Sequence, residues 1–210
     1  MNVTLPDKQI TVVYRSDGSG TTNNFTNFVK NYANEAWTTN DSFASAIPGG
    51  SSKISSYGSR FQGQSGSANV SNYIADNNGS IGYTEVSFVV DPTRAAKGMQ
   101  SALIKNAGGI YTAPTAAAAA SMIGGSTIDE KGFVTFDYKQ TKNTTAYPVV
   151  AVTYLLGKTA KSAKNAVVAD FAKWMINDYG PTAADALGYA PLAGAIKTAA
   201  LAQAAKINSK

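Results

Sequence analysis

The stretch from residue 10 to residue 32 constrains the fold more than any other part of the sequence. Residues 10–14 (ITVVY) are β-branched and aromatic, a composition typical of a buried strand. They run directly into residues 15–22, which include two glycines. Apolar residues then recur at the three- and four-residue spacing of an amphipathic helix: Phe25, Phe28, Val29 and Tyr32. A strand that passes through a glycine-rich turn into a helix is the building unit of α/β folds.

The rest of the chain continues this alternation. We expect further strands at residues 80–83, 102–105, 133–137 and 147–156. We expect further helices at residues 67–76, 85–90, 114–123, between 159 and 178, at 181–187 and at 192–207. Residues 38–66 are rich in Ser, Gly and Asn and are expected to be irregular. The pattern predicts an α/β fold with a largely parallel sheet flanked by helices.

Two of these elements look strongly buried. Residues 147–156 (YPVVAVTYLL) have the composition of a second core strand. The helix after Lys158 is predicted to place one apolar stripe against the core. The stripe comprises Val167, Val168, Phe171, Trp174 and Met175.

The composition excludes several kinds of chemistry. The chain has 210 residues, which corresponds to one large domain or two small lobes at about 150 residues per domain. It contains no His and no Cys, so Ser-His-Asp or Cys-His catalysis, Cys/His zinc sites and disulfides are all impossible. Glu85, Asp129, Glu130 and Asp137 lack the paired spacing of a hydrolase, and we interpret them as surface acids. We therefore expect no catalytic residue, no metal and no cofactor.

The charge and hydropathy patterns narrow the possible partners. The net charge is +5, but the lysines are scattered, which indicates a solvated surface rather than a nucleic-acid site. No apolar run approaches the roughly 20 residues that cross a bilayer. The first residues show neither the basic nor the apolar region of a signal peptide.

The turn at residues 15–22 has the features of an anion site. Glycines let backbone amides approach a ligand closely, and the helix that follows supplies unpaired N–H groups and a favourable dipole. Ser19 and Thr21 add hydroxyl donors, and Arg15 adds a guanidinium. Asp17 would repel a fully ionised ligand but could accept a proton from one that carries it. Phosphate carries such a proton at neutral pH and sulfate does not, so these residues favour phosphate.

A purely structural interpretation explains the same residues. Ser19 would cap the helix, the glycines would form a tight turn, and Arg15 would pair with Asp17. The spacing is not that of a P-loop, a dinucleotide fingerprint or a nucleophile elbow. From the residues alone, both interpretations stay open.

The run Arg-Ser-Asp-Gly-Ser-Gly-Thr-Thr at residues 15–22 resembles the signature of the phosphate-binding proteins of bacterial phosphate ABC transporters, the PstS family. Other stretches match this family in the same order, at residues 5–6 (LP), 79–85 (GSIGYTE), 147–148 (YP) and 187–192 (LGYAPL). The resemblance implies a type II periplasmic-binding-protein fold, in which two lobes close on an oxyanion. It also implies that the phosphate ligands are Arg15, Asp17, Ser19, Gly20 and Thr21.

The resemblance further implies an extracytoplasmic location, inorganic phosphate as ligand and the permease subunits of an ABC importer as partners. The expected lobes are residues 1–145, which carry the phosphate cradle, and residues 146–210, which return to the other lobe. We expect one complete lobe and part of a second, whose N-terminal portion is missing or supplied by a separate chain.

The chain departs from the family at residues 63–69, which lack the Lys and the acidic residue usual there, so a helix cap at Ser65 or Ser67 is the simpler interpretation. A scaffold with weak or no phosphate binding is the alternative function. A phosphoryl-handling enzyme is the third.

Overall fold

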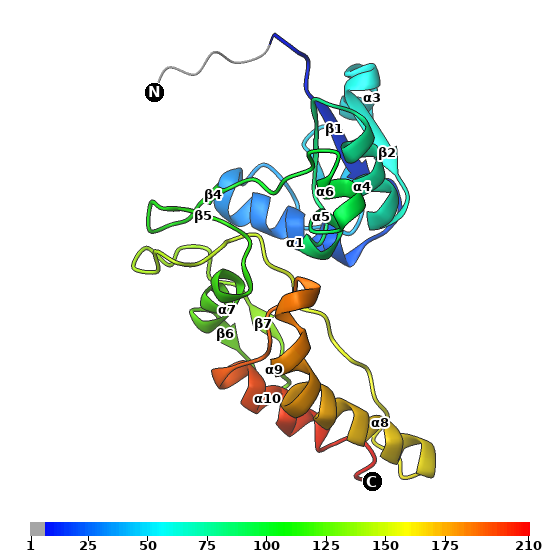
Figure 1. Cartoon of the computed structure of the whole chain (residues 1–210), viewed down its shortest axis with the longest axis vertical. Helices are drawn as coiled ribbons and strands as arrows, with labels where there is room; N and C mark the ends of the chain where they lie inside the picture. Colours follow the sequence, from blue (N-terminus) through cyan, green and yellow to red (C-terminus); the bar gives the residue numbers. More distant parts are fainter. Residues whose placement is uncertain (1–6) are drawn as a thin grey trace. The chain divides into compact units, whose positions relative to one another are not determined.

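The computed structural model describes residues 7–210 and divides into two compact units, Met1–Ser101 and Ala102–Lys210 (Figure 1). The Leu-Pro pair at residues 5–6 lies outside the described residues. The lobe boundary expected near residue 145 concerns how segments are shared between the lobes of a whole binding protein, and it stays a prediction.

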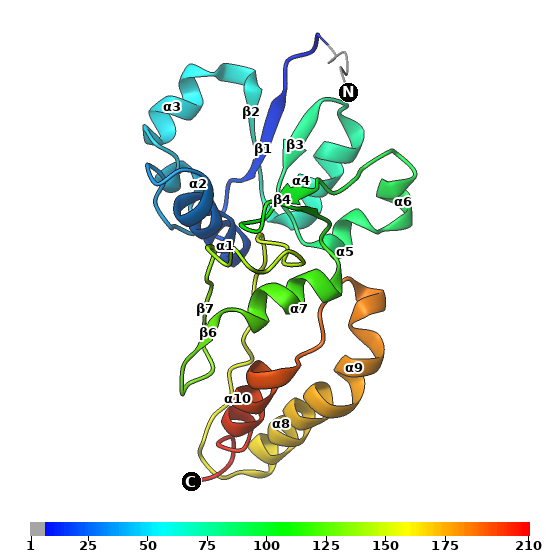
Figure 2. The same ribbon diagram turned by 90° about the vertical axis from the view of Figure 1, so that its left-hand side faces the viewer.

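The first unit is built around a three-stranded parallel sheet in the order β2-β1-β3, whose strands lie side by side in Figure 2. The strands are β1 (Thr11–Arg15), β2 (Phe61–Gln64) and β3 (Ser80–Gly82). Val12 of β1 is in register with Phe61 on one side and with Ile81 on the other. The strand that leads into the candidate anion site is therefore held on both edges.

Within residues 7–101, this unit also contains six α-helices. They are α1 (Gly20–Phe28), α2 (Phe43–Ala46), α3 (Gly50–Ser56), α4 (Gly66–Asp76), α5 (Val86–Val89) and α6 (Pro92–Ala95), with a π-helical turn at Val29–Ala33 and a 3-10 turn at Gly58–Arg60. Successive residues of a strand face opposite sides of the sheet. Val13 is fully buried, as is Val70 of α4, which packs on β1, whereas the Tyr14 ring stacks on Phe43 of α2 with centroids 4.8 Å apart.

Most predictions in this unit are confirmed and one is wrong. The strand, turn and helix at residues 10–32, the helix expected at 67–76, the strand at 80–83 and the helix at 85–90 are present. Residues 38–66, expected to be irregular, instead contain α2, α3 and β2. The sequence of β2 (FQGQ) has weak strand propensity, and its four residues become a strand because β1 offers them a parallel partner.

One glycine in the sheet is required by close packing. A Cβ at Gly82 would lie 2.6 Å from the carbonyl oxygen of Val13 and 2.9 Å from Cδ1 of Ile74. Such contacts are too short for any side chain. Gly82 therefore allows β3 and α4 to approach β1 closely.

Helices make up most of the regular structure in the second unit. Its elements are β4 (Ile104–Lys105), β5 (Tyr111–Thr112), α7 (Ala116–Gly124), β6 (Thr127–Ile128), β7 (Val134–Thr135), α8 (Ala163–Trp174), α9 (Gly180–Ala183) and α10 (Gly194–Ala204), with a π-helical turn at Met175–Tyr179 and a 3-10 turn at Asp185–Leu187. The β4–β5 and β6–β7 pairs are antiparallel hairpins. The buried side chain of Asn106 donates to the carbonyl groups of Thr144 and Ala146, which ties the first hairpin to residues 144–146.

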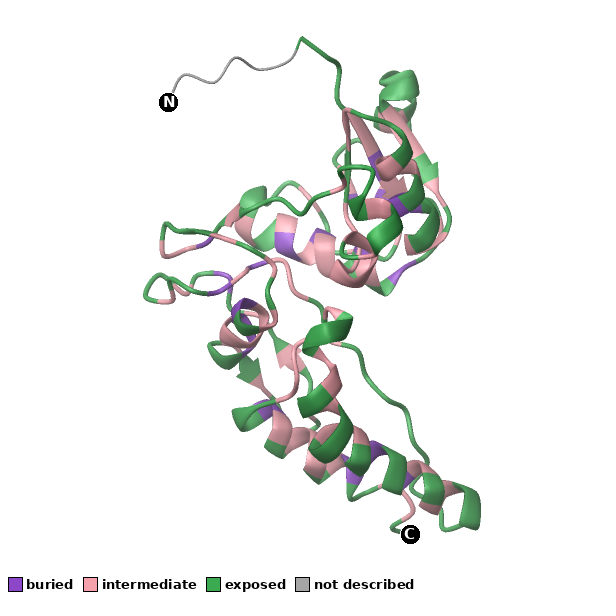
Figure 3. Ribbon diagram, viewed as in Figure 1, coloured by how far each residue is buried: buried purple, intermediate pink, exposed green. Residues whose placement is uncertain are grey.

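The two elements expected to be most buried are only partly buried in this chain (Figure 3). Residues 149–157 form neither helix nor strand, and Leu156 is 90% exposed. No other strand of the described chain lies alongside them to form a ladder. In α8 the small residues Ala169 and Ala172 are buried, whereas Val167 and Trp174 are exposed. Val168 and Met175 are half-buried, so the predicted stripe is wrong for its other three members.

Candidate functional site

The end of β1, the turn that follows it and the start of α1 carry all five sequence-predicted site residues, and Ser19 caps the helix there. The Ser19 side chain accepts a hydrogen bond from the backbone N–H of Thr22 at 3.3 Å. The Ser19 backbone N–H donates to the carbonyl of Asp41 at 3.0 Å. Because the cap uses the hydroxyl only as an acceptor, its O–H can still donate to a ligand.

The next two residues present unused backbone donors. Within residues 7–210, no protein group accepts a hydrogen bond from the backbone N–H of Gly20 or Thr21. A Cβ built at Gly20 meets no atom within 4 Å, so the space beside this residue is open. Free N–H groups at the first turn of a helix, together with the helix dipole, favour an anion.

Arg15 and Asp17 form a bidentate ion pair at the entrance to this turn. Nε of Arg15 donates to Oδ1 of Asp17 at 2.8 Å, and Nη2 donates to Oδ2 at 2.6 Å. Nη1 donates to Oγ of Ser67 at 3.0 Å. The structural interpretation, in which Arg15 pairs with Asp17, is therefore confirmed for this pair.

Asp17 is also tied to the start of α4. Its Oδ1 accepts from the backbone N–H of Gly66 at 3.0 Å. The hydrogen bonds from Arg15 and Gly66 hold the pKa of the Asp17 carboxyl well below its ordinary value, so the group is ionised at neutral pH. Its side chain is 37% exposed, and Oδ2 uses only one of its two lone-pair positions. Asp17 thus keeps one accessible position for a proton donor.

Tyr83 locks the end of β1 to α1. Its hydroxyl accepts from the backbone N–H of Arg15 at 3.2 Å and shares a 2.7 Å hydrogen bond with Oγ1 of Thr22. The ring stacks on Phe25 with centroids 4.4 Å apart. Burial raises the pKa of the Tyr83 hydroxyl, so it remains protonated and can serve both partners.

Glu85 lies at the same site, which corrects its interpretation as a surface acid. It is half-buried, and its Oε1 accepts from the hydroxyl of Thr21 at 2.7 Å. Burial opposes ionisation, but the hydrogen bonds from Thr21, Ser67 and Thr84 outweigh it and keep the pKa of Glu85 below its ordinary value. The site thus places one guanidinium, Arg15, beside two carboxylates.

Sequence reasoning missed Gly66, Ser67, Tyr83 and Glu85 as parts of this site. Ser65 holds the N-cap position of α4 without a side-chain cap bond, and Ser67 binds Arg15 instead of capping. The signal that could have found Tyr83 and Glu85 is the position of residues 83–85 directly after β3, since neighbouring parallel strands end at the same edge of a sheet.

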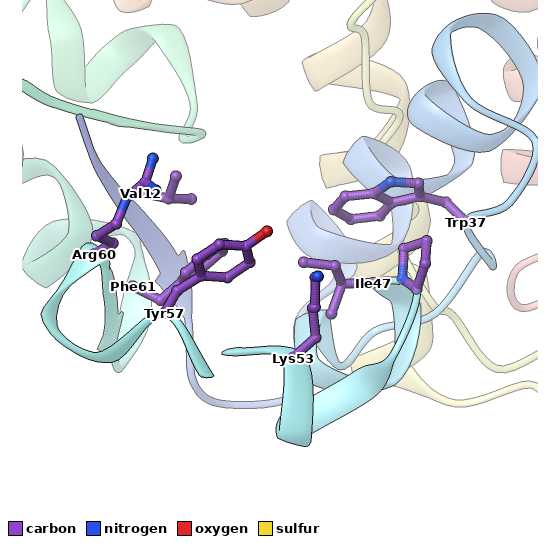
Figure 4. A pocket seen from close by; sticks show the side chains of 8 residues that line it. Val12, Trp37, Ile47, Lys53, Tyr57, Arg60 and Phe61 are labelled. Atoms are coloured by element: carbon purple, nitrogen blue, oxygen red, sulfur yellow. The ribbon is translucent and has the colours of Figure 1, made fainter. Parts of the chain in front are cut away.

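A separate hollow of about 390 Å³ lies in the same unit and shares no residue with the turn. Its lining comprises Val12, Trp37, Ile47, Pro48, Lys53, Tyr57, Arg60 and Phe61. Figure 4 shows Tyr57 and Trp37 on opposite sides of the hollow, with Lys53 between them. The walls are mainly apolar, which suits packing against carbon better than coordination of a small oxyanion.

The described residues hold no group of three or more Asp or Glu side chains placed to share a metal ion. No helix among them has the length and hydropathy of a membrane span.

Comparison with known proteins agrees with the resemblance seen in the sequence and extends over most of the chain. Residues 2–179 match the family described as "PBP superfamily domain". The phosphate-binding protein PstS of Xylella fastidiosa (strain 9a5c) is 31% identical over 195 residues, which cover 90% of this chain and 48% of that protein. The phosphate-binding protein PstS of Pasteurella multocida (strain Pm70) is 32% identical over 194 residues, which cover 90% of this chain and 51% of that protein.

A solved structure gives the same fold. The crystal structure of a DING protein superposes with a TM-score of 0.66 at 19% identity, covering 92% of this chain and 58% of that one. The α/β fold and the resemblance drawn from the sequence are confirmed. The chain spans about half the length of the curated relatives that it matches.

Proposed function

The chain belongs to the PBP superfamily, and from that membership we propose that it binds inorganic phosphate as the solute-binding component, or the C-terminal portion of it, of a phosphate ABC importer. The observation that carries the proposal is the turn at residues 15–21, where an ionised Asp17 lies beside unused N–H donors. Relatives described as phosphate-binding proteins match over most of the chain.

Each group has a role that its geometry supports. The backbone N–H groups of Gly20 and Thr21 donate to phosphate oxygens, and the Ser19 hydroxyl adds a third donor. Arg15 has two N–H bonds beyond the three that it uses, and these supply charge-assisted donors. The Thr21 hydroxyl joins the ligand only after it releases Glu85.

Asp17 provides the selectivity. Its free lone-pair position accepts the remaining proton of phosphate, whereas sulfate would place two unprotonated oxyanions together. A second carboxylate, Glu85, adds to the repulsion of a ligand that carries no proton. The site therefore selects phosphate over sulfate by protonation state rather than by size.

The proposed role is capture and delivery without catalysis, outside the cytoplasm, to a membrane permease. The matched relatives are binding proteins by name, which fits a protein that is not an enzyme. A scaffold with weak phosphate binding is the second candidate, because Nε and Nη2 of Arg15 already donate hydrogen bonds to Asp17. The third candidate, a phosphoryl-handling enzyme, has no observation in its favour.

Calorimetric titration tests the proposal. Phosphate should bind with submillimolar affinity and sulfate should give no heat beyond dilution. Gly20→Val would place a side chain in the open space beside the free N–H groups and should abolish binding, whereas the matched variant Gly124→Val, also at a glycine with open surroundings, should not. No heat with either anion would favour the scaffold. Equal binding of both anions would contradict the role of Asp17.

A further inference from the structure

Glu85 lies one hydrogen bond away from Thr21, a proposed phosphate ligand. β1 and β3 are parallel neighbours (Figure 2), and Val13 is in register with Gly82. The residues that follow Gly82 therefore reach the edge of the sheet where β1 ends at Arg15. There Oε1 of Glu85 accepts a hydrogen bond from Oγ1 of Thr21 at 2.7 Å, so a half-buried carboxylate is held against the first turn of α1.

The Thr21 hydroxyl and the Glu85 carboxylate share a single hydrogen. If Thr21 keeps donating it to Glu85, the Thr21 oxygen can only accept a hydrogen bond from a ligand. If Thr21 turns and donates to the ligand, Oε1 of Glu85 loses its donor, which is unfavourable for a half-buried carboxylate unless the ligand replaces that hydrogen. In both arrangements the pair requires a hydrogen carried by the ligand.

Asp17 requires a ligand hydrogen of its own. Its Oδ2 accepts only from Nη2 of Arg15, which leaves one lone-pair position free. Asp17 comes from the turn after β1 and Glu85 from the segment after β3, so a ligand at the turn meets two separate acceptors. Monohydrogen phosphate carries one hydrogen, and dihydrogen phosphate carries two. Only the dihydrogen ion can donate to both carboxylates at once.

The charges around the turn favour the same ion. The guanidinium of Arg15 pairs with one carboxylate, and Glu85 adds a second. A third carboxylate, of Asp41, lies beside the turn, with its Oδ2 3.5 Å from the position of a Cβ at Gly18. A dianion would bring two negative charges to this excess of carboxylates, whereas the dihydrogen ion brings one.

We propose that this site takes dihydrogen phosphate in preference to monohydrogen phosphate, and that Glu85 is the residue that determines this preference. Asp17 accepts one ligand hydrogen, and Glu85 accepts the second, either directly or through Thr21. This preference rests on the proposed function, because it concerns the ionic form of the same ligand. Binding should therefore weaken as the pH rises and the dihydrogen ion becomes scarce in solution.

The side chains of the site do not titrate between pH 6 and pH 8. The chain has no His and no Cys. Hydrogen bonds from Arg15 and Gly66 hold the pKa of Asp17 below its ordinary value, and at Glu85 hydrogen bonds lower the pKa against the effect of burial. Burial raises the pKa of Tyr83, and Arg15 stays charged. Protons exchanged with solvent in this range on binding therefore report the ionic form of the bound phosphate.

Calorimetry in buffers of different ionisation enthalpy tests the proposal, because the change of the heat with the buffer counts the protons exchanged on binding. Binding of the dihydrogen ion should take up close to one proton per phosphate at pH 8 and almost none at pH 6. The affinity for total phosphate should fall about 5-fold or more between the two. Release of close to one proton at pH 6, with almost no uptake at pH 8, would mean that the monohydrogen ion binds and would overturn the proposal.

Glu85→Gln isolates the role of this carboxylate. The amide is close in shape, carries no charge and can donate to a ligand oxygen, so the variant should accept the monohydrogen ion and lose most of the proton uptake at pH 8. Glu35→Gln is the matched control, because it makes the same change at an exposed position of the same unit, and it should keep the native uptake. Full uptake at pH 8 in Glu85→Gln would show that Glu85 does not select the ionic form.

The possible outcomes separate this preference from phosphate binding itself. No heat with phosphate at either pH would overturn the proposed function and the preference together. Phosphate binding without sulfate binding, but with proton release at pH 6, would support the proposed function and overturn the preference alone.

Discussion

The guanidinium of Arg15 holds both carboxylate oxygens of Asp17, through Nε at 2.8 Å and Nη2 at 2.6 Å, at the point where β1 passes into the turn before α1. The pair orients the one carboxylate of the turn and leaves it ionised. Because Gly66 also donates to Asp17, this residue links the starts of α1 and α4. The geometry makes Asp17 the residue whose removal changes most about the site.

Replacing Asp17 by Asn should reduce the discrimination between phosphate and sulfate. The amide carries no charge to repel sulfate and can donate to it, while phosphate loses the acceptor of its proton. We expect phosphate affinity to fall about 10-fold or more and sulfate binding to become measurable by calorimetry, in line with about 1.4 kcal/mol per factor of ten. Unchanged selectivity in the variant would show that Asp17 does not receive the ligand's proton.

Asp17 should also make the first unit sensitive to acid. Since its pKa is lowered in the folded chain, the stability that it contributes is fully present above the ordinary pKa of an Asp, about 4, and is lost as pH falls through the folded value. Its side chain is 37% exposed, so screening limits this contribution to about 1 kcal/mol.

The measurement uses urea unfolding at pH 7 and pH 3 in a Trp174→Phe background, in which Trp37 of the first unit is the one remaining tryptophan. Asp17→Asn should reduce the difference between the urea concentrations at the unfolding midpoints at pH 7 and pH 3. An equal difference with and without Asp17 would place the acid sensitivity in other carboxylates.

Two substitutions at Ser19 separate its cap from its proposed donor role. Ser19→Ala removes the acceptor for Thr22 N–H and should cost about 1 kcal/mol, whereas glycine at an N-cap costs only a few tenths. Both variants lack the hydroxyl, so both should weaken phosphate binding by a similar factor. If affinity follows stability instead, with the glycine variant binding normally, Ser19 acts as a cap alone.

Glycines 20 and 82 should respond oppositely to alanine. A Cβ at Gly82 meets the Val13 carbonyl at 2.6 Å, so Gly82→Ala should destabilise the sheet by about 1–3 kcal/mol. A Cβ at Gly20 meets nothing, and alanine favours helix, so Gly20→Ala should be at least as stable as the native chain. Thermal unfolding followed by circular dichroism compares the two, and a stable Gly82→Ala variant would contradict the packing described for β3.

Local sequence was enough to predict the strand, the turn and the first helix, because their signals lie within about 20 consecutive residues. It was not enough for β2, whose residues have little strand propensity and depend on pairing with β1. The candidate site was likewise predicted only in part. Residues of the turn were found, whereas Ser67, Tyr83 and Glu85 were missed because they reach it from segments about 50 to 70 positions away.

The wrong predictions at residues 147–156 and along α8 have a different cause. Composition reports whether a segment was selected for an apolar environment, not which polypeptide provides it. Leu156 and Phe171 carry that signal although nothing in the described chain buries them. The apolar pattern at these positions was therefore recognised correctly. The assumption that other residues of this chain bury it was wrong.

β1 has a hydrogen-bonded neighbour along each edge, and every group around Asp17 comes from residues 15–85 of a single unit. Substitutions in the second unit therefore leave the hydrogen-bond partners around Asp17 unchanged. The turn and the second unit can diverge in sequence at different rates, although one chain carries both.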